Sequence, residues 1–82
     1  MKTITYRRAA QRKLGKLPAN EREKIVLKIN QYAENPESLT NNVIKMQGEA
    51  HYRLRIGDWR VVFDEFDTVI DVIKIGSRGS IY

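Results

Sequence analysis

The chain has 82 residues, enough for one small domain, and we expect a single domain over residues 1–82. Hydrophobic residues make up 41% and charged residues 30%, which excludes a disordered tail, and no apolar run approaches the roughly 20 residues of a membrane-spanning helix. Cysteine is absent and there is one histidine, so disulfides and a thiol nucleophile are excluded and no structural zinc site is expected. We expect no metal, no cofactor and no membrane partner. The amino terminus has no apolar signal-peptide core, which predicts a cytoplasmic protein.

Positive charge is concentrated in the first third of the chain, and the formal net charge is +5. Residues 1–30 hold nine basic and two acidic side chains, residues 31–50 hold one and three, and residues 51–82 hold five of each. A basic segment of this kind indicates a polyanionic ligand or an acidic protein partner. An ordinary solvated helix face is the alternative.

The first half of the chain predicts a strand followed by two helices. The β-branched and aromatic run 3–6 is typical of a strand. An apolar stripe predicts a helix from residue 7 that ends at Gly15 and Pro18. Asn20 and Glu23 resemble a capping box that opens a second helix, which the Asn35-Pro36 pair ends. The two apolar stripes can pair as a helical hairpin. Their members are Ala10, Leu14 and Leu17 in the first helix, and Ile25, Ile29, Tyr32 and Ala33 in the second.

The second half changes to the two-residue period of strands. We expect strands over residues 43–46, 52–56, 59–66 and 69–75, with Gly57-Asp58 as a two-residue hairpin turn. The predicted fold class is α+β in the order β-α-α-β-β-β-β, an antiparallel sheet with the helical hairpin packed on one face. An acidic group at the far end of this sheet, formed by Asp64, Glu65, Asp67 and Asp71, is interpreted as a solvated turn.

The two-residue turn fixes the register of the central hairpin. Arg55 then lies opposite Arg60, and Arg53 shares their face. Apolar side chains occupy the opposite face, which can pack under the helices; they are Leu54, Ile56, Trp59, Val61 and Phe63. Like charges placed directly opposite each other destabilise a hairpin by roughly 0.2–1 kcal/mol. An anion bound between the two guanidinium groups would remove this cost.

The same topology brings the carboxyl-terminal segment to this end of the sheet. The last strand ends beside Arg60, so Arg78 arrives next to the arginine pair and Tyr82 can fold back over it. Lys45 and His51 are weaker candidates for the same side. Arginine forks and a tyrosine are suited to a phosphate and a nucleic-acid base. Each candidate also has a simpler interpretation. The strand arginines fit an ordinary solvated strand face, His51 fits a surface histidine, and Tyr82 fits a loose terminus.

The segments 52–63 and 75–82 resemble the RelE branch of the RelE/ParE toxins, and Leu17-Pro18, Asn35-Pro36 and residues 45–48 fit the same layout. The resemblance implies a RelE-like, microbial-ribonuclease-type fold and the toxin of a type II toxin–antitoxin system. It also implies a ribosome-dependent endoribonuclease that cleaves mRNA in the decoding site, where the 2′-hydroxyl attacks the phosphodiester. The implied partners are an acidic antitoxin, the ribosome and mRNA.

The resemblance also implies residue roles. Arg60 and Arg78 would brace the scissile phosphate, Arg55 would stabilise charge, and Tyr82 would stack on a base or orient the nucleophile. RNA backbone contacts would come from Lys45, Arg53 and His51.

Two positions depart from the pattern of this family. Ser77 stands where many relatives have a histidine, and Gly79 stands where another basic residue often follows. Arginine at position 55 stays protonated and is a poor general base. These departures predict intact phosphate binding with weakened proton transfer. The alternatives are a ParE-like inhibitor of DNA gyrase and a catalytically inactive toxin-fold binding module.

Overall fold

The computed structural model describes residues 1–45 and 51–79. Its elements are β1 (Thr3–Tyr6), α1 (Arg8–Lys16), α2 (Ala19–Glu34), a 3-10 helix η1 (Pro36–Asn42), β2 (Val43–Lys45), β3 (Tyr52–Ile56), β4 (Trp59–Glu65) and β5 (Val69–Ser77). The predicted α+β class and element order are confirmed, and η1 is an addition that the sequence pattern did not predict.

The strands form one five-stranded sheet in the order β1-β5-β4-β3-β2. The strands β2 to β5 pair antiparallel as predicted, but β1 runs parallel to β5, so the sheet is mixed. The expectation of an entirely antiparallel sheet was wrong for β1, because no tight turn joins this strand to its neighbour and fixes their relative direction.

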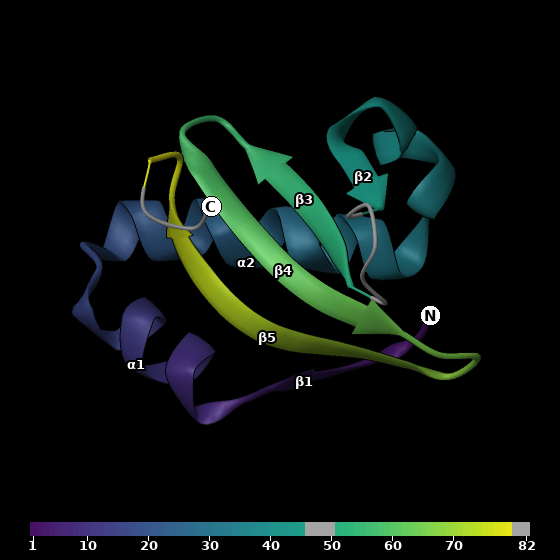
Figure 1. Cartoon of the computed structure of the whole chain (residues 1–82), viewed down its shortest axis with the longest axis horizontal. Coiled ribbons are helices and arrows are strands. Elements are labelled where there is room, and N and C mark those ends of the chain that lie inside the picture. Colours follow the sequence, from purple (N-terminus) through teal and green to yellow (C-terminus); the bar gives the residue numbers. More distant parts are fainter. Residues whose placement is uncertain (46–50, 80–82) are drawn as a thin grey trace.

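The helices cover one face of the sheet, and we call the other face the open face. Figure 1 shows α2 crossing behind the strands, with α1 beside β5. The core between helices and sheet is formed by Ala10, Ile25, Ile29, Tyr32, Ala33, Leu39, Leu54, Ile56, Val61, Phe63, Ile70, Val72 and Ile75. The two predicted helical stripes therefore point into the core, and Trp59 packs partly buried against it.

The capping-box prediction was wrong. The residue before α2 is Pro18, and no side chain caps the helix. Asn20 already lies inside the first turn, one residue after Ala19. Proline has a fixed φ, here −55°, and lacks the N–H group that a helix start would leave unpaired, so Pro18 itself can start the helix. A link of only Leu17 and Pro18 therefore joins α1 to α2.

No helix in residues 1–45 and 51–79 combines the length and apolar character needed to cross a membrane.

The acidic group at the far end of the sheet is not simply a solvated turn. The Glu65 carboxylate accepts hydrogen bonds from the Lys2 ammonium at 2.7 Å and from the Tyr32 hydroxyl at 2.5 Å. Partial burial raises the pKa of Glu65, but the bonds from Lys2 and Tyr32 outweigh it and leave this pKa below its ordinary value. Burial, together with the Glu65 carboxylate, raises the pKa of the Tyr32 hydroxyl. Glu65 thus ties the amino terminus and α2 to the end of β4.

We expect Glu65→Gln to lower the free energy of unfolding by about 1 kcal/mol at neutral pH, because the charge-assisted bond to Lys2 is lost in a partly exposed site. The carboxylate stabilises fully above its ordinary pKa of 4.5, and this contribution disappears as the pH falls through the lower folded-state pKa. Urea unfolding of the parent and of Glu65→Gln from pH 7 to pH 3 should therefore show that the difference between their free energies of unfolding decreases as the pH falls. The exposed Glu34→Gln is the control, and a pH-independent difference for Glu65→Gln would contradict the assignment.

Candidate functional site

The central hairpin has the predicted register. Arg55 pairs with Arg60, Ile56 with Trp59, and the remaining pairs continue to Tyr52 and Phe63. Gly57 has a φ of 59°, a left-handed conformation that glycine adopts without strain and that a two-residue turn requires. The two arginines are therefore direct neighbours on the open face, as the sequence predicted.

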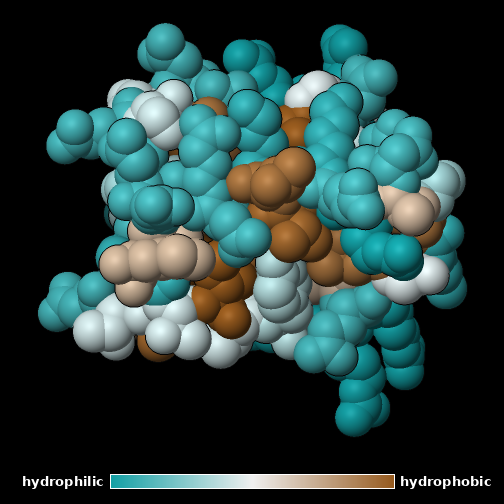
Figure 2. Space-filling view, turned by 180° about the vertical axis from the view of Figure 1, so that it is seen from behind, coloured by the Kyte–Doolittle hydropathy of each residue, from teal (hydrophilic) through white to brown (hydrophobic). Residues whose placement is uncertain are grey.

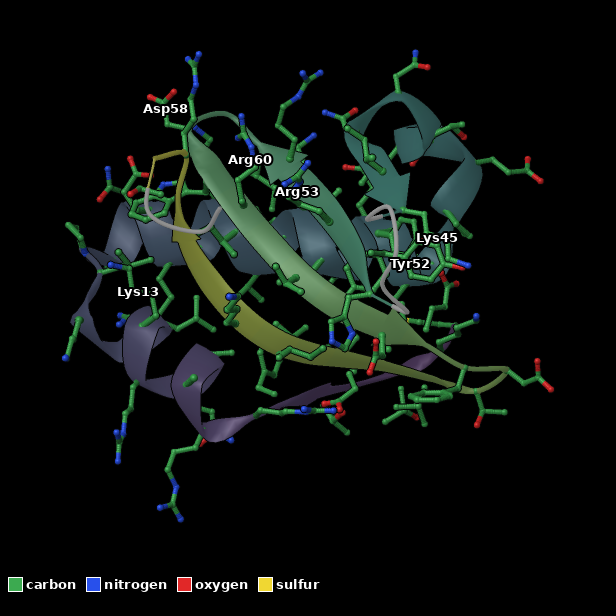
Figure 3. All side chains as sticks on the ribbon, viewed as in Figure 1. Lys13, Lys45, Tyr52, Arg53, Asp58 and Arg60 are labelled. Carbon is green, nitrogen blue, oxygen red and sulfur yellow. The ribbon has the colours of Figure 1, made fainter. Side chains whose placement is uncertain are left out.

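The Arg60 guanidinium is held against the hairpin turn. Its Nη1 donates to the Gly57 carbonyl at 2.7 Å and to the Trp59 carbonyl at 2.9 Å, and the residue is only 8% exposed. Both of these acceptors are carbonyl oxygens of the turn, and they orient the guanidinium. Figure 3 shows Arg60 on β4 close to the turn that carries Asp58.

The carboxyl-terminal segment reaches the same turn. Gly76 pairs with Arg60, and the backbone N–H of Arg78 donates to the Asp58 carbonyl at 2.7 Å. Arg78 therefore leaves the sheet beside the arginine pair, as predicted, and both Arg55 and Arg78 are exposed. Tyr82, the fourth predicted catalytic residue, lies outside the described residues.

Arg53 shares the open face with the arginine pair, opposite Val62 and two residues further from the turn. Its side chain is half-buried. Side chains two residues apart on a strand are roughly 7 Å apart. Arg53 and Arg55 are therefore spaced so that each can contact a different, neighbouring phosphate of one strand.

Lys45 does not join this cluster, and the expectation that it shares their side was wrong. It pairs with Tyr52, and residues directly opposite each other in an antiparallel pair share a face. That face is the helix side, where Tyr52 stacks on Phe63 and the Lys45 ammonium lies 5.8 Å from the Tyr52 ring centre. Figure 3 shows Lys45 and Tyr52 together, away from Asp58.

His51 lies on the open face but is neither isolated nor close to the arginine pair. Its Nδ1 is 2.5 Å from Oδ1 of Asp64 on β4. Four residues of extended strand separate it from Arg55, a distance of roughly 13 Å. His51 therefore cannot contact a phosphate held by Arg55 and Arg60. Its side chain is 37% exposed, which agrees with the alternative interpretation as a surface histidine, here paired with Asp64.

The carboxylate that holds His51 belongs to a larger polar network on the open face. Arg7 Nη2 lies 3.7 Å from Asp64 Oδ2, and Arg7 Nε donates to Asp71 at 2.9 Å. The Thr5 hydroxyl donates to the other Asp71 oxygen at 3.0 Å. The alternation of side chains along a strand could have predicted this network. Asp64 and Asp71 directly follow or precede the buried Phe63 and Val72, so both carboxylates face the open side of the sheet.

Two lysines near the turn were missed by the sequence analysis. A methyl group built on Gly57 would stand 3.4 Å from the Lys24 ammonium, so this side chain from α2 lies against the turn. The Lys13 ammonium of α1 lies 5.8 Å from the Trp59 ring centre. Both come from helices, and only the tertiary packing brings them beside the hairpin.

The arrangement is that of an anion site. Arg55, Arg60 and Arg78 come from neighbouring backbone positions at one end of the sheet, where their guanidinium groups can bind phosphate oxygens and stabilise charge that develops on them. Across residues 1–45 and 51–79, no group of three or more His, Asp or Glu side chains is arranged to hold a metal ion.

Comparison with protein families places nearly the whole chain in one family. Residues 4–82 match the family described as the ParE toxin of the type II toxin–antitoxin system parDE. No sequence among the curated proteins compared with the chain matches it.

Solved structures give the same assignment from the fold. The RelE–RelB complex of the archaeon Pyrococcus horikoshii matches with a TM-score of 0.76 and 25% identity, covering 96% of this chain and 97% of that one. The E. coli RelBE toxin–antitoxin complex matches with a TM-score of 0.73 and 25% identity, covering 94% and 96%. A mutant of E. coli YafQ matches in fold alone, with a TM-score of 0.76 at 14% identity over 100% and 99% of the two chains.

The sequence pattern pointed to the RelE branch, the family match is to ParE, and the structural relatives include RelE toxins. The chain therefore belongs to the ParE toxin family, within the RelE/ParE superfamily of toxins from type II toxin–antitoxin systems.

Proposed function

We propose that this toxin is a ribosome-dependent endoribonuclease that cleaves mRNA in the decoding site. The observation that carries the proposal is the arginine pair on the open face, with the Arg60 guanidinium oriented by two backbone carbonyls and Arg78 leaving the sheet at the same turn. Three arginines at one end of the sheet face that the helices leave uncovered suit the phosphate of an extended RNA strand.

The placement of the pair supports phosphate binding. Arg55 and Arg60 lie directly opposite each other on the open face, so both guanidinium groups can donate to one phosphodiester. Its negative charge increases as the 2′-hydroxyl attacks, so the same guanidinium groups would bind the transition state more tightly than the ground state.

Residue roles follow from this placement. In the proposal, Arg60 and Arg78 brace the scissile phosphate, Arg55 stabilises charge, and Tyr82 acts on the base or the nucleophile. Arg53 holds the RNA backbone one step along β3. Arginines stay protonated, so the rate depends on charge stabilisation more than on general base catalysis. His51 and Lys45 are left out of the phosphate site because of their distance and face.

The proposed partners are an acidic antitoxin, the ribosome and mRNA, and the proposed location is the cytoplasm. Relatives with the same fold form RelE–RelB toxin–antitoxin complexes. The sheet has edges at β1 and β2, and the β2 edge exposes Ile44 to 52%. A strand of the antitoxin can pair with such an edge while its acidic side chains face the basic surface.

Inhibition of DNA gyrase is a second candidate, and the family match to ParE favours it. Such an inhibitor needs no phosphate site for cleavage. The arginine pair and the RelE structural relatives favour the ribonuclease.

Induced expression with primer extension on an abundant translated message separates the candidates. For the ribonuclease, we expect growth arrest with new 5′ ends in register with codons. Arrest with intact messages, together with loss of supercoiling by purified gyrase, would identify a gyrase inhibitor. Normal growth with intact messages would identify a toxin fold without activity.

We expect Arg78→Ala and Arg55→Ala each to lower mRNA cleavage on purified ribosomes by about 10²-fold, because each removes a cation from the developing charge. Both side chains are exposed, so the variants should fold normally. Lys28→Ala on α2 removes an exposed lysine away from the turn and is the control. Cleavage by both arginine variants at the rate of the parent would show that the phosphate binds elsewhere.

A further inference from the structure

A depression opens at the end of the sheet, just around the hairpin turn from Arg60. Its volume is about 400 Å³, and it is bounded by the link between α1 and α2 on one side and by the turn on the other. Its lining includes Leu17, Pro18, Glu21, Lys24, Asp58 and Trp59. Nothing in the proposed cleavage reaction uses these residues.

The indole of Trp59 forms a rigid apolar surface in this depression. The ring is half-buried, and its Nε1–H donates to the Glu21 carboxylate at 2.7 Å. The Lys13 ammonium lies 5.8 Å from the ring centre. Leu17 and Pro18 add further apolar surface from the interhelical link. The hydrogen bond to Glu21 fixes the orientation of the ring, which makes it a preformed platform for a planar group.

Two lysines lie beside the platform, in addition to the carboxylates of Glu21 and Asp58. Lys24 lies against the turn at Gly57, on the helix side, while Arg60 binds the same residue's carbonyl from the open face. Figure 3 shows Lys13 and Asp58 at this end of the molecule. A polyanion bound at the arginines can therefore stay in contact with lysines as its chain passes around the turn.

We propose that the depression binds one unpaired base of single-stranded RNA, that of the nucleotide adjoining the phosphate held by Arg60. Proteins recognise unpaired RNA by placing bases on aromatic side chains and the backbone on basic ones, and this depression combines both features. The inference rests on the proposed ribonuclease function and names a second contact for the same substrate.

The polar groups at the rim give the site a base preference. The carboxylates of Asp58 and Glu21 accept hydrogen bonds and cannot donate them when ionised. Cytosine, adenine and guanine carry exocyclic amino donors, whereas uracil offers these carboxylates only its ring N3–H. The site therefore favours an amino-bearing base over uracil.

The chain contains a single tryptophan, so its fluorescence reports directly on this site. We would titrate the full-length protein at low salt with a short labelled cytidine oligoribonucleotide and with an abasic oligomer of equal length. Label anisotropy measures total binding, and Trp59 emission measures occupation of the depression. We expect quenching by the cytidine oligomer, weaker quenching by a uridine oligomer, and none by the abasic strand although it binds.

Lys24→Gln should weaken binding of the cytidine oligomer by about threefold to tenfold and lower the salt slope by about one. Lys28→Gln, one helical turn further along α2 and absent from the lining of the depression, should leave both the affinity and the salt slope unchanged. RNA binding without quenching, or equal quenching by the abasic strand, would overturn the base site and leave the proposed ribonuclease standing. Absence of RNA binding by anisotropy, with no mRNA cleavage on ribosomes, would overturn both.

Discussion

The two-residue turn between β3 and β4 is the constraint on which the other features of this toxin depend. Gly57 supplies the left-handed conformation that closes the hairpin, and the turn sets which side chain lies opposite which. A slip of β3 by one residue against β4 would move Leu54 and Ile56 to the open face and turn Arg53 and Arg55 toward the core. The apolar face of the hairpin therefore fixes the position of the arginine pair, since the burial of one set of side chains determines the exposure of the other.

The parts of the fold that the sequence could predict are those that local rules determine. The hairpin register follows from the turn length, and the core face follows from the alternation of Leu54 and Ile56 with arginines. Termination of α2 before Pro36 follows from the restriction that proline places on the preceding residue. The position of Arg78 could also be predicted, because an antiparallel neighbour of β4 must end where β4 begins.

The parts that could not be predicted depend on packing between distant segments. The direction of β1 beside β5 is set by the path of two helices, and no local pattern contains it. Lys45 was misplaced because its face depends on the register of β2, which has no tight turn to fix it. The contact of His51 with Asp64 could not be predicted, because the sequence alone shows only two separate polar residues on different strands. Tyr82 lies outside the described residues, so its predicted role stays a prediction.

The ion pairs of the sheet are concentrated at the end far from the hairpin turn. At the far end, the carboxylates are already matched by cations: Glu65 by Lys2, and Asp71 by Arg7. Figure 2 shows the opposite, helix-covered side, where hydrophilic side chains surround a central apolar area. Asp64 and Asp71 lie four residues of extended strand from the arginine pair, roughly 13 Å, beyond the distance of about 10 Å over which screened charges interact, whereas Asp58 lies in the turn itself. The formal balance of charges over residues 51–82 conceals a separation in space, with Glu65 and Asp71 paired with cations at one end of the sheet and Arg55, Arg60 and Arg78 near the turn at the other.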